Sequence, residues 1–406
     1  MSRTPDLAIM LFDLSITGVV RNAVRIAAKS HEAGLATEIW VVQDRGPARA
    51  EVPDGIPVIS FGKEIGDLYS RRQRKAASLA SKDALIELLR QRRPKLALSA
   101  GNHFHVLASA AFGDAKPALQ TRLIGRVSSA LPRFSWITLP HSLRKRRRAR
   151  MQLMAMDRLI AVSEEISKGL TGRLWIPDER ITVIRNGIDT KRAEALAKEP
   201  LSHEWFADGG PPVLLGVGRV VPQKGFDVLL KAFAIARKAA PLRLVILGTG
   251  PAEHLAVLEE LAESLGVSAD VDFHGAVSNP YPYYRAASLF VLSSRWEGMS
   301  NALLEAMACG CPVVSTVTPG SSELLDYGRF GALVPADQPE VLAKAILARL
   351  DSPVRGKNLR QRAEAFDLGV TMDKYLALFA EELAKAARVK KVSRRRRGSP
   401  ARSREG

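Results

Sequence analysis

Short apolar runs alternate with longer amphipathic stretches along most of the 406-residue chain. In the first half, the apolar runs cover residues 7–12, 36–42, 95–101, 134–140, 157–163 and 181–187. In the second half, they cover residues 212–218, 242–248, 271–277, 289–294 and 312–316. Runs of this length that alternate with helical patterns predict an α/β fold, with parallel sheets covered by helices on both faces.

The segment 199–212 contains Trp, Pro and a Gly pair and separates the two halves. It predicts an N-terminal domain over 1–203 and a C-terminal domain over 204–365, each large enough for a core of its own. A late amphipathic stretch predicts a helix over 366–387. The polar and charged residues 388–406 predict a disordered tail.

Charge is unevenly distributed within the net +18. Residues 1–200 contain 34 Lys/Arg and 20 Asp/Glu, whereas residues 201–387 contain 17 and 21. The tail from Arg388 contains nine basic residues and one acidic residue. The two domains are therefore expected to have different surroundings.

Membrane spans and disulfides are not expected. No stretch approaches the ~18–20 apolar residues that cross a bilayer, and the first apolar run is too short for a secretory signal. The only two cysteines, Cys309 and Cys311, flank one glycine. Neighbours this close rarely form a disulfide, and two ligands do not make a zinc site. We expect a reduced, cytoplasmic protein.

Candidate binding residues follow the apolar runs directly, where ligands of open parallel sheets bind. Gly18 and Arg21 follow the first run, and Arg219 and Lys224 follow the run 212–218. Two cations on one loop suit a diphosphate, although either alone is typical of a solvated surface. The turns at Gly218 and at Gly248–Gly250 lack the third glycine of the dinucleotide fingerprint, and no P-loop pattern is present.

Asp270 and Asp272 form an Asp-x-Asp pattern of a kind that can bind a metal ion. They open an apolar run and do not follow one, which is the wrong edge of a sheet for a site. No metal site is therefore predicted.

The segment 295–314, RWEGMSNALLEAMACGCPVV, carries two glutamates. Glu297 follows a predicted strand, and Ser300 is a candidate N-cap for the helix that contains Glu305. Glu305 alone is typical of a solvent-facing carboxylate near a helix start. Together with Glu297 at one crevice, it suits a ligand with several hydroxyl groups.

This segment resembles the Glu-x(7)-Glu motif of the retaining GT-B glycosyltransferases of family 4. The segments 216–234, 244–251, 271–314 and 331–346 are similar to that family's second domain in order and spacing, and 156–170 with 180–190 resemble the approach to the domain junction. The resemblance covers nearly all of residues 7–380. It implies two Rossmann-like domains that face each other across a cleft, with the C-terminal helix crossing back to the first domain.

The resemblance also implies a role for each matching residue. Arg219 and Lys224 would hold the diphosphate of a nucleotide sugar, Glu305 its ribose, and Glu297 its sugar hydroxyls. The implied catalytic residues are His141, Arg219, Lys224 and Glu297. The implied donor-binding residues are Gly18, Arg219, Lys224, Gly248, Gly250, Val277, Ser278, Glu297, Gly298, Met299, Ser300, Asn301 and Glu305. Alternatives to His141 are His103 and His105, and the loop at 141 also suits a merely basic surface.

The implied reaction moves a sugar from a UDP- or GDP-sugar to an acceptor hydroxyl, with retention at the anomeric carbon and without a cofactor or metal. The basic segments 71–75, 90–95 and 144–150 and the tail favour an anionic membrane surface, and a lipid-linked or glycan acceptor. Two alternatives remain: a nucleic-acid-binding protein, which scarce aromatic residues disfavour, and a GT-B phosphorylase or epimerase.

Overall fold

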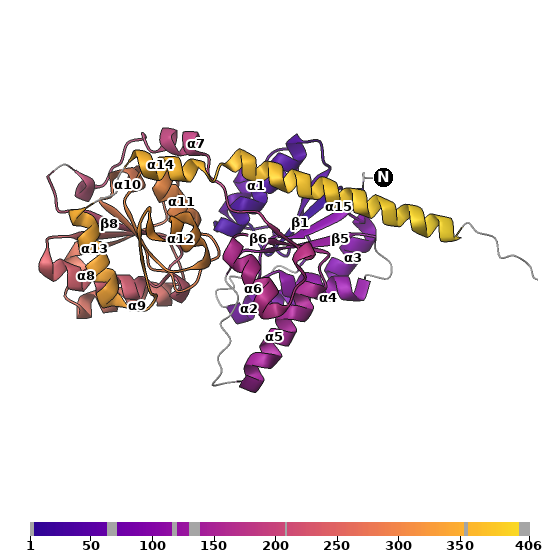
Figure 1. Cartoon of the computed structure of the whole chain (residues 1–406), viewed down its shortest axis with the longest axis horizontal. Helices are drawn as coiled ribbons and strands as arrows, with labels where there is room; N and C mark the ends of the chain where they lie inside the picture. Colours follow the sequence, from indigo (N-terminus) through magenta and orange to yellow (C-terminus); the bar gives the residue numbers. More distant parts are fainter. Residues whose placement is uncertain are drawn as a thin grey trace, which may run out of the picture. The chain divides into compact units, whose positions relative to one another are not determined.

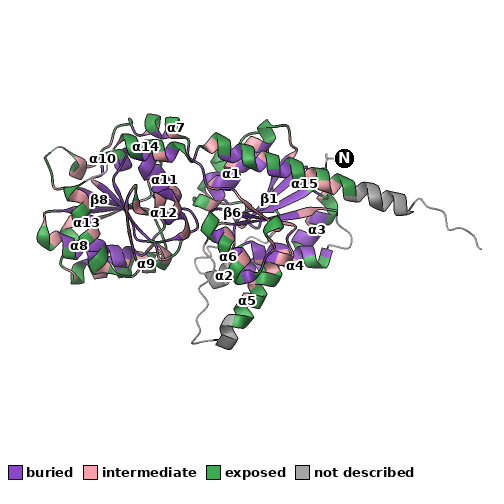
Figure 2. Cartoon of the chain, in the orientation of Figure 1, coloured by how far each residue is buried: buried purple, intermediate pink, exposed green. Residues whose placement is uncertain are grey.

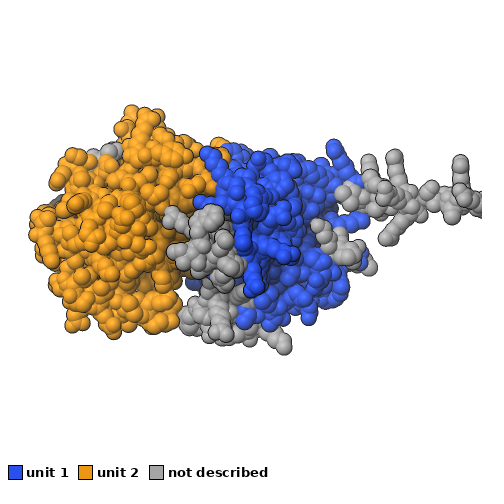
Figure 3. Space-filling view, turned by 60° about the horizontal axis from the view of Figure 1, so that its bottom comes forward, with its two compact units in different colours: residues 1–161, 167–184, 372–406 blue, residues 162–166, 185–371 orange. Residues whose placement is uncertain are grey.

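A computed structural model describes residues 4–62, 71–115, 120–129, 139–207, 209–352 and 356–397. The side chains of 71–75, 139–142 and 389–397 lie outside this description. Two compact units are present (Figure 3). Unit 1 contains Met1–Ala161, Ser167–Ile184 and Met372–Gly406, and unit 2 contains Val162–Ile166 and Arg185–Thr371.

Apart from the short segment Val162–Ile166, the chain enters unit 2 at Arg185, before the boundary expected at residue 203. The segment after Ile184 makes its contacts within unit 2, which explains the difference. Asn186 donates to the Met299 carbonyl oxygen, and the Ile188 amide donates to the Phe366 carbonyl oxygen.

Unit 1 is built on a seven-stranded sheet in the order β3-β2-β1-β4-β5-β6-β7 (Figure 1). All of its strand pairs are parallel. The strands are β1 (Leu7–Leu11), β2 (Thr37–Val41), β3 (Val58–Ser60), β4 (Leu96–Ser99), β5 (Arg122–Val127), β6 (Arg158–Ala161) and β7 (Ile181–Val183). The helices are α1 (Gly18–Glu32), α2 (Arg71–Ala80), α3 (Lys82–Arg92), α4 (His105–Ala115), α5 (Leu139–Met154) and α6 (Glu164–Leu174).

Unit 2 is built on a six-stranded sheet in the order β10-β9-β8-β11-β12-β13, again all parallel. The strands are β8 (Val213–Val217), β9 (Arg243–Leu247), β10 (Val271–Gly275), β11 (Leu289–Leu292), β12 (Val313–Thr316) and β13 (Ala332–Val334). The helices are α7 (Thr190–Leu196), α8 (Phe226–Ala239), α9 (Ala252–Ser264), α10 (Tyr281–Ala286), α11 (Asn301–Ala308), α12 (Pro319–Leu324), α13 (Pro339–Asp351) and α14 (Lys357–Glu364).

The inner strands of both sheets are buried, the edge strands β3, β7, β10 and β13 are partly exposed, and the outer helix faces are exposed (Figure 2). The prediction of two Rossmann-like parallel-sheet domains is confirmed. Three strands were not predicted: β3, β5 and β13. In β5 the apolar pattern is broken by arginines, one of which, Arg126, is buried and donates from Nε to the Tyr375 hydroxyl.

The strand predicted over 134–140 falls largely outside the described residues, and the part that is described differs from the prediction. Leu139 and Pro140 begin helix α5, so His141 lies on the first turn of a helix. A proline is tolerated there because the first helical amides have no partner within the helix.

The last helix, α15 (Leu368–Arg397), begins in unit 2 and continues in unit 1, which confirms the predicted crossing. Its buried Glu382 accepts a hydrogen bond from Arg122 Nε of β5 at 2.5 Å. The helix runs past residue 387, so the expectation of a disordered tail is wrong for 388–397. Lys and Arg are good helix formers and extend the helix. Within the described residues, no helix is both long and apolar enough to cross a membrane.

Candidate functional site

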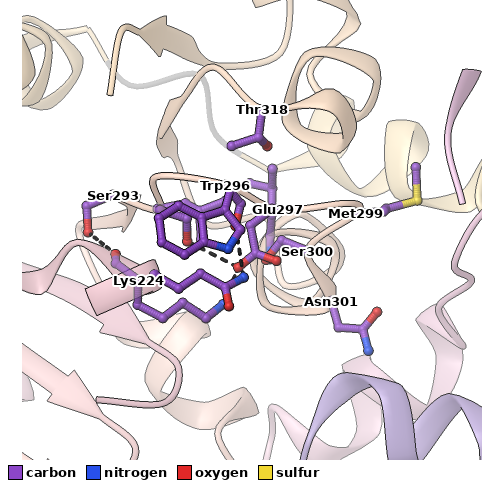
Figure 4. Close-up of polar contacts among 12 residues, drawn as sticks. Lys224, Ser293, Trp296, Glu297, Met299, Ser300, Asn301 and Thr318 are labelled. Carbon is purple, nitrogen blue, oxygen red and sulfur yellow. Dashed lines mark hydrogen bonds and ion pairs between the residues drawn. The ribbon is translucent and has the colours of Figure 1, made fainter. Parts of the chain in front are cut away.

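Two loops meet where the neighbouring strands β8 and β11 end. One is the 3₁₀ turn Pro222–Lys224, and the other runs from Ser293 to Glu297. The Arg295 amide donates to the Gln223 carbonyl oxygen at 2.8 Å, and Ser293 Oγ donates to the Lys224 carbonyl oxygen at 2.9 Å. These bonds hold the two strand ends together, as Figure 4 shows for Ser293 and Lys224.

Lys224 and Glu297 form an ion pair between these loops (Figure 4). Lys224 Nζ lies 2.5 Å from Glu297 Oε1, and Ser294 Oγ donates to the same carboxylate oxygen at 3.2 Å. Their side chains are 15% and 13% exposed. The pair is partly shielded yet reachable, so an anionic ligand can take the place of the carboxylate.

Glycines make this close approach sterically feasible. Gly225 has φ +65°, and a Cβ added there would lie 2.2 Å from the Ser293 carbonyl oxygen. A Cβ on Gly218 would lie 2.8 Å from Lys224 Cε. The lysine side chain therefore lies directly over the end of β8, and a side chain at position 218 would displace it.

Arg295 holds the same two loops through its side chain. Its Nη atoms donate to both carboxylate oxygens of Asp227 at 2.9 and 2.6 Å, and Nη1 also donates to the Pro222 carbonyl oxygen at 2.6 Å. Its Nε donates to Asp337 at 2.6 Å. Burial tends to raise the pKa of Asp227, but the hydrogen bonds and charge of Arg295 outweigh it and lower that pKa. The sequence did not indicate this role, because the acidic partners lie far away along the chain.

Helix α11 begins beside Glu297 and presents its first turn at the site. Ser300 is the N-cap, as predicted, and its Oγ accepts from the Leu303 amide. Asn186 Nδ2 donates to the Met299 carbonyl oxygen at 2.9 Å and to Asn301 Oδ1 at 2.8 Å. Asn186 was missed in the sequence because it ends a predicted strand in an Asn–Gly pair, which is typical of an ordinary turn.

Gly298 packs tightly against helix α12. A Cβ on Gly320 would lie 2.3 Å from the Gly298 carbonyl oxygen, so the backbones of the two segments are in contact. The loop from Glu297 to Asn301 is therefore fixed on both sides before any ligand binds.

Glu305 lies in the second turn of α11 and is buried. Its Oε2 accepts a hydrogen bond from the Tyr284 hydroxyl at 3.1 Å. Burial and the neighbouring Glu305 raise the pKa of Tyr284 well above its usual value, so this hydroxyl keeps its proton and donates. The interpretation of Glu305 as a solvent-facing carboxylate is therefore wrong. The side chain is buried, and a buried carboxylate needs a hydrogen-bond partner, which Tyr284 provides.

The glycines Gly248 and Gly250 follow β9 and touch the loop after β8. A Cβ at these positions would lie 1.9 Å from the Gly218 carbonyl oxygen and 2.1 Å from that of Val220. Both glycines also line a cavity of about 100 Å³ at the ends of β8, β9 and β10, with Thr249, Phe273 and Gly275. Val277 and Ser278 follow β10 on its exposed or half-buried loop.

Arg219 lies on the exposed loop directly after β8. Gly18 is the first residue of α1 in unit 1, and the side chain of His141 lies outside the described residues. Their contacts with a donor stay predictions.

Of the alternative histidines, His105 is buried, and its Nδ1 lies 2.7 Å from Ser99 Oγ. Burial lowers the pKa of His105 to about 3, with smaller contributions from nearby cations. The ring is therefore neutral near pH 7 and is unsuited to contributing charge to a ligand site.

Asp272 belongs to a polar cluster apart from the loops just described. His203 Nε2 lies 2.9 Å from Asp272 Oδ2, and His274 Nδ1 lies 3.0 Å from the same oxygen. These are the residue types of a metal site, and the part of the chain described by the structure holds one such group. However, the Trp205 amide donates to His203 Nδ1, which places the ring hydrogen on Nε2, where it donates to Asp272. The ring nitrogen that faces Asp272 is thus engaged in a hydrogen bond, which favours a polar contact over metal ligation.

Comparisons with known proteins agree with this architecture. Residues 16–192 match the family Glycosyltransferase Family 4, and residues 211–352 match the family Glycosyl transferases group 1. The chain is 32% identical over 247 residues to D-inositol 3-phosphate glycosyltransferase 1 of Catenulispora acidiphila, which covers 56% of this chain and 58% of that protein. It is 37% identical over 166 residues to the lipopolysaccharide core biosynthesis glycosyltransferase LpsE of Rhizobium meliloti, covering 41% and 46%. The chain thus spans about half the length of these curated relatives.

A solved structure of Anabaena Alr3699/HepE in complex with UDP and glucose shares the fold. The TM-score is 0.72 at 19% identity, covering 93% of this chain and 99% of that one. The two parallel-sheet domains, with charged residues at the strand ends of the second, define a protein of the GT-B class. The two family matches place it more narrowly: the chain belongs to the family 4, group 1 glycosyltransferases.

Proposed function

We propose that this protein transfers a sugar from a nucleoside diphosphate sugar to an acceptor hydroxyl, with retention at the anomeric carbon. The observation that carries the proposal is the Lys224–Glu297 pair, which joins a cation and a carboxylate where adjacent strands end. A donor of this class presents a diphosphate, which suits Lys224, beside sugar hydroxyls, which suit Glu297. The two curated relatives named above are glycosyltransferases by name.

In this proposal the diphosphate replaces Glu297 as the partner of Lys224, and Arg219 on the neighbouring exposed loop adds a second cation. Glu297 then accepts hydrogen bonds from the sugar. The Leu303 amide is already capped by Ser300 Oγ, so the amides of Asn301 and Ala302 before it would donate to the ligand at this helix N-terminus, where oxygen-rich ligands bind well. Glu305 accepts from the ribose, and the base lies at the cavity beside Gly248 and Gly250.

The proposed reaction proceeds on one face of the sugar. The bond from the anomeric carbon to the diphosphate oxygen breaks, and the acceptor oxygen bonds to that carbon on the same face. The acceptor proton passes to the leaving phosphate oxygen, so no protein base is required. Lys224 and Arg219 stabilise the charge that develops on the leaving diphosphate, which makes this the step they accelerate most.

A nucleotide panel tests the donor class. We expect one of UDP, GDP and ADP to raise the melting temperature of the protein, because a ligand that binds only the folded state stabilises it. The matching nucleotide sugar should then be consumed in the presence of an acceptor extract and EDTA. A panel in which no nucleoside diphosphate stabilises the protein contradicts the proposal.

We further propose that the acceptor is lipid-linked or a glycan precursor, and that the protein meets it at an anionic cytoplasmic membrane surface. Helix α5 supports this. The apolar side chains Leu143 and Met151 on it are 51% and 63% exposed. Exposed cations lie among them: Arg144, Lys145, Arg147, Arg148 and Arg150. Trp175, 60% exposed, lies under the guanidinium of Arg146, whose Cζ is 3.6 Å from the ring centroid.

Apolar and aromatic side chains among arginines suit the headgroup region of a membrane better than nucleic acid, which has no apolar layer to receive them. The other basic segments of unit 1 add less free positive charge to this proposed membrane surface, or their side chains lie outside the described residues. In the segment 90–95, Arg92 pairs with Glu38 and Lys95 pairs with Asp6. The side chains of 71–75 lie outside the described residues.

Vesicle binding tests this surface. The protein should sediment with vesicles that contain phosphatidylglycerol and not with pure phosphatidylcholine. The variant Arg147→Glu/Met151→Ser should lose most of the binding, whereas Arg329→Glu, a surface change in unit 2, should retain it. Binding that is unaffected by the α5 variant, or that favours an oligonucleotide over the vesicles, contradicts the proposed surface.

A further inference from the structure

The loops that carry Lys224 and Glu297 depend on contacts beyond that ion pair. Arg295 contributes both a backbone and a side-chain link, from its amide to Gln223 and from Nη1 to the Pro222 carbonyl oxygen. The same guanidinium holds Asp227, in the first turn of the helix that follows Lys224. Arg295 therefore contacts residues on both sides of Lys224 and stands two residues before Glu297.

We propose that Arg295 is a positioning residue that sets the separation of Lys224 and Glu297 and so determines how well the site fits the donor at the reacting end. This rests on the proposed function of the site as a nucleotide-sugar site. Arg295 touches neither the proposed diphosphate partner nor the sugar partner directly in this structure. It acts through the two loops that bear them.

The geometry of Arg295 distinguishes it from an ordinary surface ion pair. Its pair with Asp227 is bidentate, and its side chain is only 22% exposed. Such fork-shaped contacts fix direction as well as distance, which a lysine cannot reproduce. The contact with Asp337 contributes less to this, because the Asp337 side chain is 58% exposed.

Loss of Arg295 should affect turnover more than nucleotide binding. A nucleoside diphosphate adapts to a loosened Lys224, whereas a reacting group displaced by about 1 Å can lose about 100-fold in rate. For Arg295→Ala we expect kcat to fall about 30- to 100-fold. We expect the Kd for the nucleoside diphosphate to change less than about threefold. Asp227→Asn, which keeps the shape of the acceptor, should show a smaller decrease in kcat.

A conservative variant and a double variant distinguish a positioning role of Arg295 from a general loss of structure. Arg295→Lys keeps the charge but not the fork, so it should restore the melting temperature while leaving kcat low. Arg329, an exposed cation of unit 2 that pairs with Asp326 at 3.7 Å, offers the matched control, and Arg329→Ala should behave as wild type. If Arg295 acts through Glu297, then adding Arg295→Ala to Glu297→Gln should slow turnover by less than about threefold.

The decisive experiment measures kcat and nucleotide Kd for wild type, Arg295→Lys, Arg295→Ala, Glu297→Gln and the double variant Arg295→Ala/Glu297→Gln. Normal kcat in Arg295→Lys, or fully multiplicative losses in the double variant, overturns the positioning role while leaving the proposed function intact. Failure of the wild type to bind any nucleoside diphosphate overturns the proposed function itself.

Discussion

The two units use the same parallel-sheet architecture but join their strand-end loops by different chemistry. In the described part of unit 1, hydrogen bonds of polar side chains contribute to these contacts. The Ser15 amide and hydroxyl donate to Asp13 within the loop after β1, and the Ser128 amide donates to Asn102 between the loops after β5 and β4. His105 faces Ser99 in the interior.

In unit 2, the corresponding loops are joined by full charges. Lys224 pairs with Glu297, and Arg295 pairs with Asp227 and Asp337. Partly exposed charges exchange partners readily with a charged ligand, whereas buried neutral contacts have nothing to gain from one. The difference supports the proposal that the strand ends of unit 2 hold the diphosphate of the donor.

The largest expected effect comes from removing the cation of unit 2. Lys224→Met should lower turnover about 100- to 1,000-fold, because a developing negative charge on the leaving group loses its nearest donor. Lys231→Met, on the exposed face of the following helix, is the matched control and should keep normal turnover. A Lys224→Met enzyme within about threefold of wild type would show that the strand-end charges of unit 2 are structural, like the contacts of unit 1.

The buried His105 of unit 1 should make the protein less stable at acidic pH. Because burial lowers the pKa of His105 from 6.5 to about 3, the unfolded chain binds the proton more readily between these values. The contribution of His105 to the free energy of unfolding is therefore fully present above pH 6.5. It is lost as the pH falls, by about 3 kcal/mol at about pH 4. Denaturant unfolding of wild type and His105→Asn checks this. Equal pH dependence in both proteins would remove His105 as the cause.

Substitution of a glycine after β9 tests how much close backbone packing contributes to the stability of unit 2. Gly248→Ala should lower the free energy of unfolding by about 3 kcal/mol, because its Cβ would meet the Gly218 carbonyl oxygen at 1.9 Å and its φ is +137°. Gly266→Ala has φ +68° but open space around it, and should cost about 1 kcal/mol. Equal costs would show that backbone conformation, and not contact, explains Gly248.

The smallest expected effect concerns the support of Glu305. Tyr284→Phe removes the hydroxyl that donates to Glu305, which should cost about 1 kcal/mol of stability. Nucleotide affinity should fall with it if Glu305 binds the ribose, since the carboxylate then loses its fixed direction. Unchanged affinity alongside the lost stability would assign Glu305 a structural role only.

The sequence predicted most of the strands because apolar runs of five or six residues have few alternatives inside an α/β fold. It missed β5, whose Arg126 finds a partner on the distant α15, and the edge strands β3 and β13, which are short and partly exposed. The domain boundary was predicted too late, because the Asn186 contacts that bring the segment into unit 2 are tertiary.

At the site, the two glutamates and the two cations were predicted from their places after strands. The contact between Lys224 and Glu297 could only be guessed from the shared edge of the sheet, because the residues are far apart along the chain. The role of Arg295 could not be predicted for the same reason, because the three acceptors of its side chain lie on other segments of the chain. The burial of Glu305 depends on Tyr284, which belongs to a different helix.

The central claim is that Lys224 exchanges Glu297 for the donor diphosphate, and nucleotide titration of Glu297→Gln tests it most directly. If the carboxylate competes for Lys224, its removal should tighten binding of the nucleoside diphosphate about fivefold, corresponding to about 1 kcal/mol, even though turnover falls. Calorimetry on wild type and Glu297→Gln measures this difference. Weaker or unchanged nucleotide binding in the variant would contradict the exchange of partners.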